Sequence, residues 1–259
     1  MMKSVAIIGA GASALYATLA CNDLGFKPLL YSTDEGLRIQ QGAYWLKWLP
    51  ANLRSKFTLH RITLDKIGTR EEYVEKQWPI HPESYTSSFP NERTVEFGFN
   101  PYEVLSELFN GERFVYQQLI HSLSSADLKV VGQSFDFVFH AFPTEAAFKN
   151  NKGVMVKIPV VSSKTCTESN MTIYNGTKDD CIRTSFLFGN KFVEYPFYYD
   201  TTKLPETVNF IWDIRPTEVA PNMYPIAPNI IPMGRFGRLD RSLLSHDSYE
   251  LVRNILENY

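Results

Sequence analysis

The sequence predicts an α/β fold in which a mainly antiparallel β region is inserted into a parallel sheet flanked by helices. Three observations carry this prediction. A β-α-β pattern begins almost at the N-terminus, and a strand, a glycine-rich turn and an amphipathic helix close the chain. Between them, residues 154–214 form a series of short β-like runs separated by Gly, Asn, Asp and Pro. Two layers of different character, one inserted within the other, follow from this order.

The first element is a buried strand that runs into a glycine turn with the pattern G-x-G-x-x-A. Gly9 permits the tight turn, Gly11 removes a side chain where a pyrophosphate approaches the backbone, and Ala14 lets the following helix pack closely on the strand. The first helical turn also contains Ala12 and Ser13, and its unpaired N–H groups favour an anion. The motif therefore predicts a dinucleotide-binding turn.

The second strand follows the first helix and ends where a dinucleotide site usually has an acid for the ribose hydroxyls. Here that position is Ser32, followed by Thr33 and two acidic residues that a longer turn would bring to the ribose. The 2′-phosphate of NADPH prefers an uncharged residue there with an arginine nearby, and Arg38 is available. These residues alone leave the identity of the dinucleotide open.

The middle of the chain alternates helix and strand signals. Thr69 and Glu72 have the spacing of a capping box and predict a helix over 70–77, and Pro101 predicts the first turn of another helix that extends to Phe109. Strands are expected over 114–120 and 135–143. The β-like runs of the inserted region are 154–161, 171–174, 182–188, 191–195 and 207–214.

The C-terminal pattern is a strand from Asn229 that enters a glycine-rich turn through Gly237, and then an amphipathic helix from Ser245 to Asn258. The complete set of elements predicts two regions. Residues 1–45, 96–145 and 229–259 form a discontinuous Rossmann-like nucleotide domain, and residues 46–95 and 146–228 form a substrate or cap region.

The bulk composition excludes several classes of protein. The formal net charge is −2 and no basic block occurs, so nothing indicates binding to nucleic acid or to an anionic membrane surface. The three cysteines and the histidines show no metal-ligand spacing, so no metal site is expected. With no signal peptide and no membrane-spanning segment, we expect a cytoplasmic protein. The oligomeric state is not predicted.

Taken together, the chain resembles FAD-dependent oxidoreductases of the glutathione-reductase-like superfamily, nearest in layout to the amine-oxidase and galactopyranose-mutase branch. Residues 1–35, 135–145 and 229–259 carry the resemblance. It implies FAD as the cofactor, with Gly9, Gly11 and Ala14 on the pyrophosphate, Ser32 or a neighbour on the ribose, and Gly234 and Arg235 beside the flavin. Only one dinucleotide fingerprint is present, which favours hydride transfer from a C–N or C–O bond of a substrate to flavin N5.

The segment 36–50 has two interpretations. In the flavoproteins just named, the corresponding passage runs past the pyrophosphate toward the flavin, which makes candidates of Arg38, Gln41, Gly42 and Ala43. Alternatively, it is an amphipathic helix that carries Trp45 and Trp48 into the core. Both interpretations remain open.

The sequence does not identify the catalytic base; His246, Arg183 and Tyr44 are the candidates for a catalytic role. Trp45, Trp48 and Arg183 are the candidates for substrate contact. Arg183 would hold a carboxylate or phosphate, or else form a surface salt bridge. His246 begins the last helix, either near the flavin or in solvent.

Other functions remain open beside the FAD-dependent oxidoreductase. One is an NADPH-binding reductase, favoured by Ser32 and Arg38. Another is a catalytically silent nucleotide-binding protein. A further resemblance, over residues 42–50, 174–180 and 183–189, is to small phage flavoproteins, and it implies a lyase or oxidase that remodels amino-acid-modified thymine in DNA. The expected partner is therefore a small molecule or a modified base.

Overall fold

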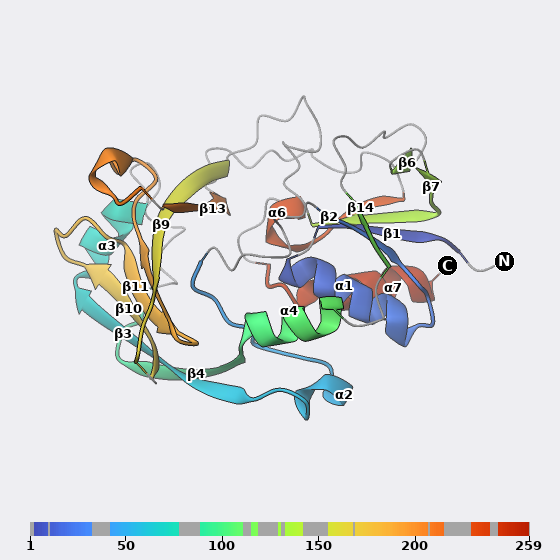
Figure 1. Cartoon of the computed structure of the whole chain (residues 1–259), viewed down its shortest axis with the longest axis horizontal. Coiled ribbons are helices and arrows are strands. Elements are labelled where there is room, and N and C mark those ends of the chain that lie inside the picture. The colour runs from blue at the N-terminus through green and yellow to red at the C-terminus, as the bar shows by residue number, and fades with distance from the viewer. Residues whose placement is uncertain are drawn as a thin grey trace. The chain divides into compact units, whose positions relative to one another are not determined.

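The chain forms two compact units, each with its own sheet (Figure 1). Unit 1 consists of Met1–Ile39, Tyr102–Val154 and Glu218–Tyr259, and unit 2 of Gln40–Pro101 and Met155–Thr217. The computed structural model describes residues 3–9, 11–32, 42–77, 89–110, 115–118, 129–130, 133–141, 155–167, 169–206, 208–214, 229–238 and 243–258. Each unit is described by itself below.

Unit 1 is built on a five-stranded sheet in the order β14-β8-β1-β2-β5, and all four pairs of neighbouring strands are parallel. Its strands are β1 Val5–Ile8, β2 Leu29–Ser32, β5 Val115–Gln118, β8 Phe137–His140 and β14 Ile230–Pro232. Each residue of β1 and β8 is buried, as the apolar runs in the sequence predict. Because the strands are parallel, their carboxyl ends meet at one edge of the sheet.

The described part of unit 1 also contains the helices α1 Ala12–Asp23, α4 Pro101–Asn110, α6 Gly234–Arg238 and α7 Asp247–Glu257, and the paired strands β6 Lys129–Val130 and β7 Gln133–Ser134. Helices α1 and α7 pack on each other (Figure 1). The Tyr249 hydroxyl on α7 donates a hydrogen bond to Asp23 Oδ2 on α1, at 2.5 Å. The two ends of the chain therefore belong to the same unit.

Unit 2 is built on a seven-stranded sheet in the order β13-β9-β12-β11-β10-β3-β4. Its elements are α2 Ala51–Arg54, β3 Leu59–Gly68, α3 Arg70–Gln77, β4 Thr94–Phe99, β9 Met155–Lys164, β10 Asn170–Gly176, β11 Arg183–Leu187, β12 Asn190–Glu194, the 3-10 helix η2 Thr201–Lys203 and β13 Asn209–Ile214. Every neighbouring pair is antiparallel except β3 with β10. The predicted α/β fold, with a parallel sheet and a mainly antiparallel β region, is confirmed.

The seven-stranded sheet has one face that we call the inner face. Alternate residues of its strands are buried there, among them Ile62, Leu64, Tyr174 and Phe192. Helix α3 contributes Tyr73 and Val74 to the same hydrophobic cluster. The capping box predicted for α3 is half formed, because the Glu72 N–H donates to Thr69 Oγ1 at 3.3 Å.

Three expectations about local structure were wrong. Residues 96–99, expected in the nucleotide domain, form part of β4 in unit 2, because they pair with β3. Of the two interpretations of the segment 36–50, the amphipathic helix across Trp45 and Trp48 is wrong: residues 43–50 form no helix, and Leu46 bridges Phe99. The glycine-rich turn expected after β14 is instead the short helix α6, which begins at Gly234. No helix in the described part of the chain is long and apolar enough to span a membrane.

Candidate functional site

The turn after β1 brings the backbone of three elements together. Gly9 has φ +122°, and its N–H donates to Tyr31 O at 2.7 Å. A Cβ at Gly9 would lie 3.3 Å from the Cβ of Ala141, which follows β8, and 3.8 Å from the Cβ of Ala14 in α1. A side chain larger than that of Ala14 or Ala141 would push α1 away from the five-stranded sheet.

The N-terminus of α1 is open and carries no competing acid. Gly11 is the N-cap and is exposed, no side chain caps the helix, and the first turn holds no acidic residue. No atom of the described structure lies within 4 Å of the position that a Cβ of Gly11 would occupy. The helix therefore begins with N–H groups that the N-cap side chain does not satisfy and with no acid in its first turn, which is the arrangement that binds a phosphate.

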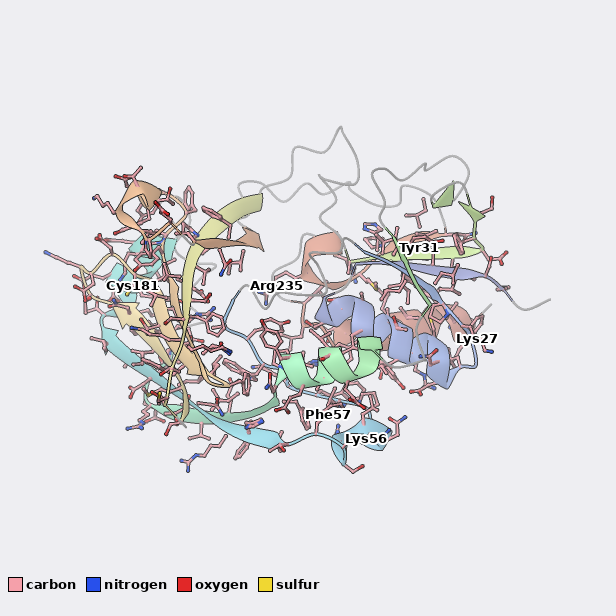
Figure 2. The ribbon with its side chains drawn as sticks, viewed as in Figure 1. Lys27, Tyr31, Lys56, Phe57, Cys181 and Arg235 are labelled. Carbon is pink, nitrogen blue, oxygen red and sulfur yellow. The ribbon has the colours of Figure 1, made fainter. Side chains whose placement is uncertain are left out.

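The short helix α6 closes the same edge of the sheet. The Met233 N–H donates to His140 O at 2.9 Å, which joins the end of β14 to the end of β8. Gly234 has φ +64°, and a Cβ there would lie only 2.1 Å from Ser13 Oγ on α1. The next residue, Arg235, is half-buried, and its side chain extends from α6 (Figure 2). Seven predicted cofactor residues thus lie at one edge of unit 1: Gly9, Gly11, Ala12, Ser13, Ala14, Gly234 and Arg235.

His246 is the N-cap of α7 and is half-buried rather than fully solvated. Its ring meets the Tyr16 ring edge-on, with centroids 6.3 Å apart, and its Nε2 lies 3.7 Å from Asp247 Oδ1. These contacts fix the imidazole between α1 and α7. A role for His246 in catalysis stays a prediction.

Several predicted cofactor residues lie outside the described residues. Thr33, Arg38 and Gln41 belong to this group, and of Ser32 only the backbone, at the end of β2, is described. Gly42 and Ala43 are described and belong to unit 2, where both are buried. Ala43 is part of the hydrophobic cluster on the inner face.

Arg183 is held by a partner inside unit 2. Its Nη2 lies 2.5 Å from Glu194 Oε1, its Nε donates to Glu194 Oε2 at 3.2 Å, and the two side chains are 23% and 8% exposed. Burial disfavours the charged guanidinium and is the largest single effect on its pKa, but the attraction and hydrogen bond of Glu194, together with the Tyr174 and Tyr73 hydroxyls, exceed it and raise the pKa of Arg183 above its ordinary value. The guanidinium also lies over the Tyr174 ring. A surface salt bridge is therefore the wrong description, because the pair is largely buried between neighbouring strands.

The expected substrate residues Tyr44, Trp45 and Trp48 are all half-buried. The indole of Trp45 lies across Gly98, where a Cβ would be 2.3 Å from Trp45 Cδ1. The Trp48 ring lies beneath the Arg54 guanidinium, 5.8 Å away. Trp45 therefore packs on the sheet.

Sequence reasoning missed two aromatic side chains, His60 and Phe188, that contact each other on this sheet. His60 pairs with Gly98 across β3 and β4, and the ring of Phe188 meets the His60 ring edge-on, with centroids 5.2 Å apart. Both residues became neighbours only through long-range pairing of strands. Within the described residues, no group of three His, Cys, Asp or Glu side chains could hold a metal ion.

Comparisons with known proteins support the fold. No family model matches the chain, and no curated protein matches it. Among solved structures, the flavin-dependent brominase Bmp2 matches with a TM-score of 0.54 and 10% identity, over 99% of this chain and 80% of the brominase. MibH, a tryptophan 5-halogenase, matches with 0.53 and 11% identity, over 99% of this chain and 66% of MibH.

A variant of 2-methyl-3-hydroxypyridine-5-carboxylic acid oxygenase matches with a TM-score of 0.53 and 8% identity, over 100% of this chain and 88% of the oxygenase. The chain spans 48% of the length of the peptidyl tryptophan dihydroxylase QhpG, at a TM-score of 0.42. At these identities the likeness is one of fold. The chain has a fold of the type found in FAD-dependent enzymes.

Proposed function

We propose that this chain is a FAD-dependent oxidoreductase in which unit 1 holds the cofactor and unit 2 contributes the substrate site. The observation that carries the proposal is the N-terminus of α1, where Gly11 leaves bare backbone, with no described atom at the position of its missing side chain and no N-cap side chain on the helix. The fold shared with FAD-dependent enzymes agrees with it. A relationship to the amine-oxidase and galactopyranose-mutase branch is part of this proposal.

The residues at the edge of unit 1 fit such a cofactor. Gly9, Gly11 and the first turn of α1 would hold the pyrophosphate through backbone N–H groups, and Ser32 would approach the ribose. Gly234 and Arg235 would lie beside the flavin, because the close contact of Gly234 with Ser13 brings α6 to the same edge. FAD would supply the electron-accepting chemistry that no side chain provides.

For the reaction, we propose oxidation of a C–N or C–O bond, with a hydride leaving the substrate carbon. A second candidate is oxygen-dependent modification of an aromatic ring. It is favoured by the described aromatic side chains of unit 2 and by the brominase, halogenase and oxygenase that share the fold. Tyr44, Trp45 and His246 remain candidates near the substrate, whereas Arg183 is already bound to Glu194.

Purification of the full-length chain tests the cofactor first. Released FAD, identified by its absorption spectrum, is expected, and a colourless protein that binds only NADPH would overturn the proposal. The variant Ser32→Glu distinguishes binding of FAD from binding of NADPH. Its new carboxylate would accept hydrogen bonds from the ribose hydroxyls of FAD but would repel the 2′-phosphate of NADPH. Affinity for both ligands is measured on this one variant.

The reaction class is tested on the flavin-bound protein. Bleaching of the flavin by an amine or alcohol without oxygen is expected for the hydride reaction. Bleaching by an external reductant, followed by oxygen-dependent change of an aromatic compound, would favour the second candidate. DNA containing amino-acid-modified thymine belongs in the same screen, and absence of turnover across it would favour a catalytically silent nucleotide-binding protein.

A further inference from the structure

We infer that Trp45 and His60 form the hydrogen-bonding end of a binding site on the inner face of the unit 2 sheet, for a planar aromatic ring that carries an amide-like acceptor and donor. The inference deepens the proposed function, since it names a substrate class for unit 2. Three observations carry it: the shared location of the two rings, their nitrogen atoms without a described partner, and a third aromatic residue, Phe188, that a hairpin turn holds against His60.

The two rings share one location on the sheet. His60 and Gly98 are direct partners across β3 and β4, so their side-chain positions lie on the same face. The Trp45 indole fills the space that a Gly98 side chain would take, 2.3 Å from its Cβ position. Trp45 and His60 are therefore neighbours although they belong to different segments, and the absence of a side chain at Gly98 is what lets them approach.

Both rings hold a buried polar atom that none of the described residues satisfies. Trp45 Nε1 and His60 Nε2 are shielded from solvent, and neither has a hydrogen-bond partner within the described part of the chain. Buried polar atoms in native proteins are nearly always paired, so two unpaired atoms at one location need an explanation. The indole N–H is a donor only, whereas an imidazole nitrogen accepts or donates according to its protonation.

The adjoining turn fixes the position of a third aromatic residue, Phe188. Phe188 has φ +52°, a conformation uncommon for a bulky side chain, in the turn between β11 and β12. Its N–H donates to Asn170 Oδ1 at 2.8 Å, and its carbonyl accepts from Asn190 Nδ2 at 3.0 Å, so the conformation is enforced from both sides. This holds the Phe188 ring edge-on against His60. Positive φ at both Phe188 and Gly189 is what a two-residue hairpin turn requires, so the turn itself fixes the position of this ring.

The chemistry of the three rings defines the ligand. Aromatic walls favour a flat ring through stacked and edge-on contacts. The indole N–H needs an acceptor such as a carbonyl oxygen, and the imidazole nitrogen needs a complementary group beside it. A carboxamide on an aromatic ring supplies both in one plane. Because the nitrogen atoms are shielded, a neighbouring ring must move when such a ligand enters.

Benzamide is the probe, with cyclohexanecarboxamide and toluene as comparisons. The first comparison keeps the amide without the flat ring, and the second keeps the flat ring without the amide. Binding is measured by calorimetry on the full-length chain. Benzamide is expected to bind more tightly than either comparison compound, and equal binding of all three would overturn the inference.

Trp45→Phe and His60→Phe then test the two atoms, since each keeps an aromatic ring and removes the unsatisfied nitrogen. If the nitrogen atoms serve a ligand, each variant should weaken benzamide binding about five-fold. His60→Phe should also raise the unfolding temperature by about 2–4 °C, because it removes a buried polar atom without a partner at similar volume. Trp45→Phe also deletes part of a packed ring, so it is assessed by affinity alone. Tyr198→Phe is the matched control: it also removes a polar ring substituent in unit 2, but from a side chain that is 55% exposed.

A gain in unfolding temperature with unchanged benzamide affinity would show that the orphaned atoms are only a structural defect, and a loss of stability would show that they are satisfied in solution. Either result contradicts the inference. Binding is measured with and without FAD on the protein. Failure of FAD binding alone would therefore refute the proposed function and leave the benzamide result to stand by itself.

Discussion

Two ion pairs in this chain have the same Nη2–Oε1 distance, 2.5 Å, but differ in burial. Arg183 and Glu194 are 23% and 8% exposed, whereas Arg253 and Glu257, one helical turn apart on α7, are 39% and 42% exposed. Arg183→Met leaves the Glu194 carboxylate buried without its counterion. Because an uncompensated buried charge must be desolvated, the free energy of unfolding should fall by about 3–5 kcal/mol.

The double variant Arg183→Met with Glu194→Leu removes both charges from the same space. It should recover most of the loss, since apolar residues of similar volume often replace a buried pair without cost. Arg253→Met is the matched control, and its exposed pair should leave stability almost unchanged. Urea denaturation followed by tryptophan fluorescence measures all three. Equal losses of unfolding free energy in Arg183→Met and Arg253→Met would refute the argument from burial. A double variant no more stable than Arg183→Met would refute it as well.

Three further predictions concern unit 1. Gly11→Val should abolish FAD binding but leave the circular dichroism spectrum unchanged, because its side chain enters space that is free of protein atoms; full FAD retention would contradict this. Gly234→Leu should lower the unfolding temperature much more than an alanine at an exposed site, since φ is +64° and Ser13 Oγ lies 2.1 Å from the new Cβ. The Ser4 N–H and hydroxyl donate hydrogen bonds to Asp136 Oδ2 at 2.6 and 2.8 Å, and these bonds lower the pKa of Asp136. The ionised carboxylate therefore stabilises the fold above about pH 4, and this stabilisation is lost as the pH falls further. The difference in unfolding temperature between wild type and Asp136→Asn should narrow on acidification, and a constant difference would count against it.

Local signals in the sequence predicted most elements of the fold. The capping box predicted α3 at Arg70–Gln77, and Pro101 marked the start of α4. The helix expected around Trp45 failed for a local reason as well. Pro50 disfavours helical backbone at the residue before it, and the bridge from Leu46 to Phe99 holds the segment extended.

Pairing between distant strands was beyond local signals. Arg183 was recognised as notable, but its partner depends on the register of β11 with β12, which places Arg183 opposite Glu194. Both strands were predicted from the sequence. A two-residue turn between them fixes their register, and this register would have placed Arg183 opposite Glu194. His60 had no such signal, because β3 and β4 meet only after a connection of more than 20 residues.

The order of segments along the chain has a consequence for how the protein is made. Strand β3 pairs in parallel with β10, whose first residue follows about 100 positions later, and the last strand of the parallel sheet, β14, ends only at Pro232. On the ribosome, the first βαβ pattern and β3 must wait for partners that are synthesised afterwards. The exposed edges of both sheets are thus unprotected during synthesis, and neither unit can be expressed as one uninterrupted stretch of the natural sequence.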